Sequence, residues 1–202
     1  ELIIDLLAWM RRDDVPALAH AAIAHAQFES IHPFTDGNGR IGRALISALL
    51  RRRGVTRNIV MPLASGILGI RDEYFDALTS YRAGDTVEII QIVTRSAHVA
   101  AVESRASIDE LQGLPAEWRS LLPGRRSTAT ERIIEALFSN PVMAADSLLS
   151  ASGSTPTATY AAIDRLTNVG IIREITGRKR DRVWVATDAL GELDALDRRI
   201  QR

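Results

Sequence analysis

A short run of residues near the start of the chain combines a histidine, a carboxylate, a Gly-Asn-Gly turn and two arginines. Residues 31–43 read IHPFTDGNGRIGR. Glycines on both sides of Asn38, at the start of a helix, expose a concave stretch of backbone N–H groups that suits phosphate. Arg40 and Arg43 are three residues apart, so their guanidinium groups lie on one helical face and can bind neighbouring phosphates. The run therefore predicts an anion-binding site.

Two further side chains in this run indicate what happens to the anion. Asp36 is the carboxylate of the loop, and a magnesium ion that bridges two phosphates is held by one or two protein carboxylates. His32 precedes a rigid proline, and histidine is the side chain best suited to accept a proton from a hydroxyl near neutral pH. Phe34 is expected to anchor the loop in the core. These residues predict a magnesium-assisted phosphate site with a general base beside it.

A purely structural interpretation explains each feature alone. Gly-Asn-Gly is a common turn, and a helix that follows an aspartate and carries two arginines is usually a solvated helix. A structural loop does not, however, need a histidine, a carboxylate and two arginines at once. Their combination in one run favours a functional site.

The rest of the chain predicts a mainly α protein with a second, small α+β domain. Apolar periodicity, alanine content and capping residues predict helices at residues 2–10, 17–30, 38–53, 71–81 and 85–97. Glycines and prolines between Gly113 and Ser127 interrupt any long element, so we expect a helical domain at 1–112, a linker at 113–126 and a second domain at 127–202. That domain is expected to contain helices at 128–138, 144–150 and 156–169, strands at 171–175 and 182–185, and a last helix ending near Ile200.

Composition excludes several classes of protein. The 202 residues carry a formal net charge of zero, so any affinity for nucleic acid must come from a local patch. Without cysteine there is no disulfide, no thiolate zinc site and no cysteine nucleophile. The sequence contains neither an apolar run long enough to span a membrane nor a secretory leader, so we expect a cytoplasmic location. Because the chain enters an apolar stripe directly after Glu1, we expect a fragment.

Residues 32–43 match every fixed position of the Fic-family signature, His-x-Phe-x-(Asp/Glu)-Gly-Asn-Gly-Arg-x-x-Arg. On this signature the chain resembles a bacterial Fic protein, and the resemblance extends over residues 2–104. It implies a helical domain that transfers AMP from ATP to a Ser, Thr or Tyr hydroxyl of a target protein and releases pyrophosphate. ATP as the substrate nucleotide and Mg²⁺ as the cofactor follow from the same resemblance.

The resemblance also implies a role for each residue of the signature. His32 would deprotonate the target hydroxyl, and Asp36 would hold Mg²⁺ between the α- and β-phosphates. The expected phosphate contacts are Gly37, Asn38 and Gly39 for the α- and β-phosphates, and Arg40 and Arg43 for the β- and γ-phosphates. Related Doc proteins, which transfer the γ-phosphate, carry Lys where Gly39 stands, so this glycine favours nucleotidyl transfer.

Several assignments around the signature leave alternatives open. Tyr74 and Phe75 lie on a helix that flanks the adenine pocket in the family, although such an aromatic pair is also typical of a core. His25, Glu29 and His32 have a spacing that could hold a transition metal, but Pro33 disrupts the last turn. The family's inhibitory motif, (Ser/Thr)-x-x-x-Glu-(Gly/Asn), is missing, and Ser127 is instead expected to cap a helix. The family's β-hairpin flap is missing as well, so the fragment is expected to modify targets weakly.

Residues 127–202 resemble a winged helix-turn-helix module, which several Fic proteins carry. Its recognition helix would present Thr155, Thr157, Thr159 and Tyr160 to DNA, and its wing would present Arg178, Lys179, Arg180 and Arg182. Winged helices also dock proteins or dimerise, so DNA, a protein partner and a homodimer all stay open. The alternative functions are a nucleotide-sensing transcriptional regulator and an enzyme that removes AMP with the same site.

Overall fold

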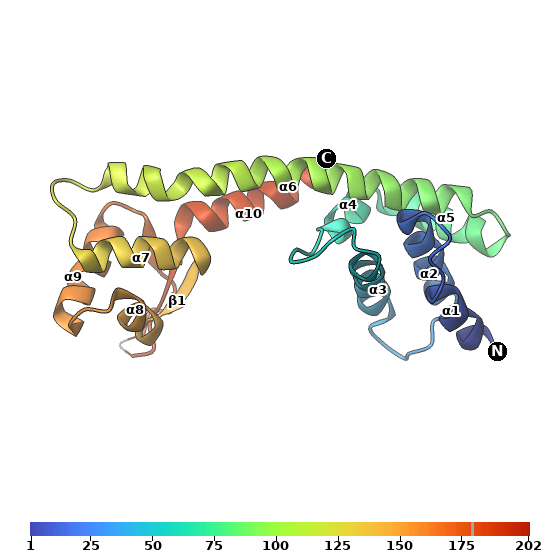
Figure 1. Cartoon of the computed structure of the whole chain (residues 1–202), viewed down its shortest axis with the longest axis horizontal. Coiled ribbons are helices and arrows are strands. Elements are labelled where there is room, and N and C mark those ends of the chain that lie inside the picture. The colour runs from blue at the N-terminus through green and yellow to red at the C-terminus, as the bar shows by residue number, and fades with distance from the viewer. Residues whose placement is uncertain (179) are drawn as a thin grey trace. The chain divides into compact units, whose positions relative to one another are not determined.

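The computed structural model describes residues 1–178 and 180–202 and divides the chain into two compact units (Figure 1). The first unit contains residues 1–104 and 197–202, and the second contains residues 105–196. Among the described residues, no helix has the length and apolar character needed to cross a membrane. Lys179, one of the residues predicted to contact DNA, lies outside the described part of the chain.

The first unit is helical, as predicted. Its helices are α1 (Leu2–Met10), α2 (Ala17–Ile31), α3 (Asn38–Arg52), α4 (Leu63–Gly69), α5 (Arg71–Arg82) and the beginning of α6 (Val87–Leu121). The predicted cap of α6 is confirmed, since the Val87 N–H donates to Asp85 Oδ1 at 2.8 Å. Helix α4 contains two glycines and was not predicted, because its amphipathic pattern is too short to stand out.

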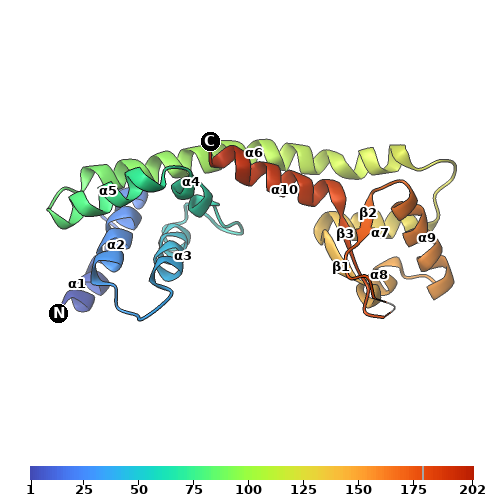
Figure 2. The same ribbon diagram turned by 180° about the vertical axis from the view of Figure 1, so that it is seen from behind.

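Helices α2 and α3, which carry the signature, pack directly against each other (Figure 2). The alanines of α2 at positions 21, 22, 24 and 26 are fully buried, and small side chains allow two helices to approach closely. At Gly42 of α3, a Cβ atom would lie only 2.3 Å from Glu29 Oε1 of α2. A larger residue at this position would therefore have to displace the Glu29 carboxylate.

The expected interruption at residues 113–126 is wrong over most of its length. Helix α6 continues through Gly113 and Pro115 to Leu121. Leu114 and Trp118 are buried in the core of the second unit, and the Trp118 indole N–H donates to Asp188 Oδ2 at 3.0 Å. Tertiary packing thus outweighs the low helix propensity of glycine and proline. The compact units divide inside α6, between Ser104 and Arg105.

The second unit is a helical layer on a small antiparallel sheet. It contains α7 (Thr128–Ser139), β1 (Val142–Ala144), α8 (Ala145–Ser152), α9 (Pro156–Asn168), β2 (Ile172–Glu174), β3 (Val183–Ala186) and most of α10 (Thr187–Ile200). The strand order is β1-β3-β2 (Figure 2). Met143 pairs with Trp184, and Arg173 pairs with Val185. The predicted helices and the β2–β3 hairpin are confirmed. Strand β1 was missed because a strand of three residues leaves no readable alternation.

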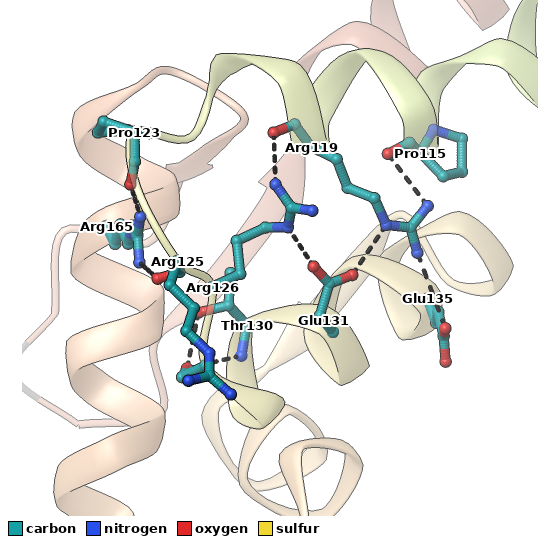
Figure 3. Close-up of polar contacts among 10 residues, drawn as sticks. Pro115, Arg119, Pro123, Arg125, Arg126, Thr130, Glu131, Glu135 and Arg165 are labelled. Atoms are coloured by element: carbon teal, nitrogen blue, oxygen red, sulfur yellow. Dashed lines mark hydrogen bonds and ion pairs between the residues drawn. The ribbon is translucent and has the colours of Figure 1, made fainter.

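A group of charged side chains, the Glu131 cluster, joins the end of α6 to α7 (Figure 3). Its members are Arg119, Arg126, Glu131 and Glu135. Glu131 accepts from Arg119 Nε at 2.8 Å and also from Arg126 Nε, and these two hydrogen bonds hold the pKa of Glu131 below its usual value. The predicted cap is confirmed beside it, because Ser127 Oγ accepts from the Thr130 N–H at 3.2 Å.

Candidate active site

The loop between α2 and α3 is shaped by the side chain of Asn38. This residue is 2% exposed, and its Oδ1 accepts from the Phe34 N–H at 3.0 Å while its Nδ2 donates to the Phe34 carbonyl at 2.6 Å. The amide is therefore used within the loop, which leaves the backbone N–H of Asn38 as its group for an anion. The expectation that Phe34 anchors the loop in the core is wrong, since this ring is 49% exposed and rests against Phe28 with centroids 6.2 Å apart.

Gly37 and Gly39 lie next to the guanidinium groups of Arg40 and Arg43. Gly37 precedes α3 with φ of 81°, a left-handed conformation that glycine adopts without strain. A Cβ on Gly37 would lie 3.5 Å from Arg40 Nη2, and a Cβ on Gly39 would lie 3.2 Å from Arg43 Nη1. Both guanidinium groups thus fold back toward the start of α3, where the helix dipole is positive. The structure brings together the backbone and the side chains predicted to bind phosphate.

Asp36 presents an exposed carboxylate at the same end of α3. Its Oδ1 accepts from the Gly37 N–H at 2.6 Å, and its Oδ2 lies 3.4 Å from Arg40 Nη2. The Asp36 side chain is 92% exposed, so both oxygens keep lone pairs that can face a ligand. Magnesium takes one or two protein carboxylates together with phosphate oxygens and water, and this arrangement fits that requirement.

The transition-metal interpretation of His25, Glu29 and His32 is wrong. His25 is fully buried, and its Nε2 is already within 3.0 Å of the Tyr74 hydroxyl, whereas His32 is exposed. Across residues 1–178 and 180–202, no group of three or more His, Asp and Glu side chains is arranged to hold a metal ion.

His32 ends α2 in the left-handed conformation, with φ of 49° and ψ of 57°. Its N–H donates to the Phe28 carbonyl at 2.9 Å, which completes the last turn of the helix. Residues other than glycine adopt this conformation uncommonly, and when they do they are often found at functional sites. The backbone of His32 is thereby fixed at the point where the chain leaves α2 and enters the anion-binding loop, and its imidazole is exposed there.

A cavity of about 320 Å³ opens beside Arg43 and is lined by both aromatic residues singled out from the sequence. Tyr74 is buried, and desolvation raises the pKa of its hydroxyl to about 12. Phe75 is 51% exposed, and the Arg71 guanidinium lies 5.7 Å from its ring centroid. Tyr74 thus forms part of the wall, and Phe75 offers its ring to a ligand. A larger cavity of about 470 Å³ is lined by Glu73, Asp76 and Glu88 together with Arg95, which pairs with Glu73 at 2.6 Å, so the remaining carboxylates make it unsuited to an anion.

The last residues of the chain also line the 320 Å³ cavity, which the sequence did not predict. Asp197 accepts from Ser65 Oγ at 2.5 Å and from Gln201 Nε2 at 2.6 Å. The backbone of Gln201 packs against Gly69, where a Cβ would lie 2.5 Å from the Gln201 carbonyl oxygen. The glycines of α4 at positions 66 and 69 were the available signal, because glycine inside a helix often marks a close approach.

The residues predicted to contact DNA differ in accessibility. Thr157, Arg178 and Arg180 are exposed. Arg182 is half-buried, with its guanidinium 5.9 Å from the ring centroid of Tyr160 and 5.2 Å from that of Trp184. The expectation that Thr159 is presented at the surface is wrong, since Thr159 is buried and bonds the Ser152 hydroxyl at 2.6 Å.

Comparison with known proteins identifies similarity in the first part of the chain. Residues 1–50 match the model of the Fic/DOC family. Over 98 residues the chain is 31% identical to "Protein adenylyltransferase fic-1" of Caenorhabditis briggsae, which covers 47% of this chain and 18% of that protein. Over 89 residues it is 34% identical to a "Probable protein adenylyltransferase" of Aquifex aeolicus, which covers 44% of this chain and 25% of that protein.

Two more proteins are similar to parts of this chain. "Protein adenylyltransferase Fic" of Nematostella vectensis is 35% identical over 91 residues, covering 43% of this chain and 20% of that protein. A solved Fic family protein from Desulfovibrio desulfuricans G20 aligns with 92% of this chain and 54% of its own, with 20% identity and a TM-score of 0.48. The chain thus spans a quarter or less of the curated relatives described above. The family model and these relatives support a Fic/DOC domain that includes residues 1–50.

Proposed function

We propose that the first unit transfers AMP from ATP to a hydroxyl side chain of a target protein. The observation that carries this proposal is the convergence of Arg40, Arg43 and the glycine backbone at the start of α3, next to the exposed Asp36 carboxylate. The names of the curated relatives, which are protein adenylyltransferases, point to the same reaction.

In the proposed reaction the target oxygen attacks the α-phosphorus. His32 accepts the proton of the attacking hydroxyl, and the bond between the α-phosphorus and the bridging oxygen breaks to release pyrophosphate. Arg40 and Arg43 neutralise the charge that develops on the leaving group, and the backbone N–H groups of residues 37–39 hold the α- and β-phosphates. Asp36 would hold Mg²⁺, which shields the phosphate charges when it is bound. We place the adenine base of ATP in the 320 Å³ cavity that Phe75 lines.

Gly39 argues for transfer of the nucleotidyl group and against transfer of the γ-phosphate. With no side chain at this position, the Arg43 guanidinium reaches to within 3.2 Å of where a Cβ would be, and a lysine there would displace it. The leaving phosphates can therefore approach the helix start closely.

The experiment that tests this function supplies the protein, Mg²⁺ and a lysate with ATP labelled at either the α- or the γ-phosphate. Label from α-labelled ATP is expected on protein together with released pyrophosphate. The matched control is the His32→Ala protein. Transfer of the γ-label with release of ADP would refute the proposal, whereas label that disappears from AMP-modified protein would favour the reverse reaction.

A second function is proposed for the second unit, which we interpret as a winged helix that binds DNA. Thr157 on α9 and the exposed Arg178 and Arg180 in the β2–β3 loop are the side chains that favour it. Phosphate contacts of this kind make binding salt-dependent. Arg178→Ala with Arg180→Ala should weaken DNA binding and flatten its salt dependence, with Arg125→Ala as control. Binding that is unchanged in the double variant would instead favour a protein-docking or dimerisation surface.

A further inference from the structure

The 320 Å³ cavity beside Arg43 has polar lining residues from the other end of the chain, and the proposed reaction gives them no role. They are Asp197, in the last turn of α10, and Gln201, which follows this helix. Both belong to the same compact unit as the signature. A few polar groups in the lining of a cavity commonly fix the orientation of its ligand. These two side chains are therefore candidates for orienting a bound nucleotide.

The Asp197 carboxylate is held in place at both of its oxygens. Ser65 Oγ of α4 donates to Oδ1 at 2.5 Å, and Gln201 Nε2 donates to Oδ2 at 2.6 Å. The backbone of Gln201 itself rests against α4, because a Cβ on Gly69 would lie 2.5 Å from the Gln201 carbonyl oxygen. Ser65 and Gly69 lie one turn apart on α4, so this helix contacts the end of the chain at two points. A group fixed in this way before a ligand arrives loses little entropy on binding.

Both oxygens of Asp197 keep lone pairs after these two hydrogen bonds. A carboxylate offers about four acceptor positions and no donor. Ser65 and Gln201 each fill one position, and the side chain of Asp197 is exposed. A ligand atom that pairs with Asp197 must therefore carry an N–H or O–H group.

The other lining residues of the cavity match the other parts of a nucleotide. Phe75 is 51% exposed and Leu68 is 57% exposed, so both offer apolar surface on which a flat base can rest. Arg43, which also lines the cavity, is proposed to bind phosphate. On the edge of adenine the 6-amino group is the donor, and the ring nitrogens are acceptors. Asp197 supplies the acceptor that this amino group requires.

We propose that Asp197 is a specificity-determining residue that accepts a hydrogen bond from the 6-amino group of adenine, while Ser65 and Gln201 hold its carboxylate in place. A base with a carbonyl oxygen at this position, such as hypoxanthine, would lose the hydrogen bond and set an acceptor against the carboxylate. This role rests on the proposed binding of ATP in the cavity. It assigns the preference for the base to a residue that lies outside the signature.

The test compares the binding of ATP and ITP by calorimetry in the presence of Mg²⁺. ITP carries a carbonyl oxygen in place of the 6-amino group, whereas GTP is unsuitable because its 2-amino group can also donate to a carboxylate. The unaltered protein should bind ATP about tenfold more tightly than ITP, since ITP lacks one hydrogen bond to a charged group. In Asp197→Asn, which keeps the shape of the side chain, this preference should fall to about twofold, because an amide can donate as well as accept.

Two further variants separate this contact from general effects on the cavity. Ser65→Ala keeps the carboxylate but removes a hydrogen bond that holds it, so the preference for ATP should lie between those of the unaltered protein and Asp197→Asn. Asp194→Asn is the matched control, because Asp194 is an exposed aspartate one turn earlier on α10 that does not line the cavity. It should keep the full preference. An equal preference in Asp197→Asn and the unaltered protein would overturn the role of Asp197.

The transfer of α-label, measured on the same unaltered protein, distinguishes this role from the proposed function. If AMP is transferred while ATP and ITP bind equally, the role of Asp197 fails and the proposed function stands. If the preference for ATP depends on Asp197 while no AMP is transferred, the role stands and the proposed function fails. A protein that binds neither nucleotide would overturn both.

Discussion

Two clusters of arginines and carboxylates in this molecule differ in how many of their hydrogen-bonding groups are already paired. At the start of α3, Arg40 lies 3.4 Å from Asp36, and the two side chains are 77% and 92% exposed. In the Glu131 cluster, both arginines donate to one carboxylate and also to backbone carbonyls, and each of these three side chains is about one-third exposed. The first cluster keeps hydrogen-bond donors and acceptors that can bind a ligand. In the second cluster these groups are paired with one another and with backbone carbonyls. Residue types alone do not distinguish a binding site from a structural joint.

The largest expected effect separates ATP binding from AMP transfer at the start of α3. His32→Ala should reduce AMP transfer by about a hundredfold or more, the usual contribution of a general base. ATP affinity should remain, because the imidazole makes no contact with the phosphates in the proposed reaction. The measurements are α-label incorporation and calorimetry. Transfer that persists in this variant would show that another group accepts the proton.

The next effect contrasts one arginine from each cluster. Arg40→Ala combined with Asn38→Ala should weaken ATP binding by about tenfold or more, since a charge-assisted hydrogen bond and the shape of the loop are lost together. Arg119→Ala should leave ATP affinity unchanged and lower the thermal midpoint of unfolding. Equal ATP affinity in the double variant and the unaltered protein would contradict the proposed phosphate site.

Asp36→Asn should change the dependence of ATP binding on magnesium. The amide keeps an acceptor for the Gly37 N–H but loses the charge that favours a divalent cation. ATP affinity in the presence of Mg²⁺ should fall several-fold and approach the value measured with EDTA. The matched control is Asp146→Asn, an exposed aspartate in the first turn of α8. A magnesium dependence identical to that of the unaltered protein would remove Asp36 from the proposed ion site.

The smallest expected effect concerns the Glu131 cluster and the dependence of stability on pH. The pKa of Glu131 is lowered in the folded protein, so its contribution to stability is present above the unfolded value of 4.5 and is lost as pH falls below it. Glu131→Gln should therefore destabilise the protein by about 1 kcal/mol at pH 7, which corresponds to a few degrees in the thermal midpoint. Thermal unfolding of both proteins between pH 7 and pH 3 should give curves that converge at low pH. A constant difference would argue against the ion pairs.

The sequence predicted those features that local chemistry determines. Alanine-rich α2, the stripe of α3, the caps at Asp85 and Ser127 and the gathering of Arg40 with the glycine turn all follow from neighbouring residues. The prediction from sequence was wrong where contacts between residues far apart in the chain determine the local structure. The core of the second unit keeps Gly113 and Pro115 helical through Leu114 and Trp118.

The candidate site shows the same division. Asn38 was expected to contact phosphate, and its buried side-chain amide is used to close the loop with Phe34. Asp197 reaches the cavity from the other end of the chain, and no local pattern marks that contact. The sequence therefore identified the site residues of one segment but could not predict which partners arrive from elsewhere in the fold.

The hydrogen bond between Ser65 and Asp197 joins residues 132 positions apart. Residues 197–202 complete the first unit, yet the ribosome adds them after the whole of residues 105–196. A contact of such high sequence separation closes late, because the loop between its ends must be ordered first. During synthesis the signature can therefore fold and expose its arginines before the wall formed by Asp197 and Gln201 exists. Until residues 197–202 are in place, the cavity beside Arg43 lacks the part of its lining that Asp197 and Gln201 provide.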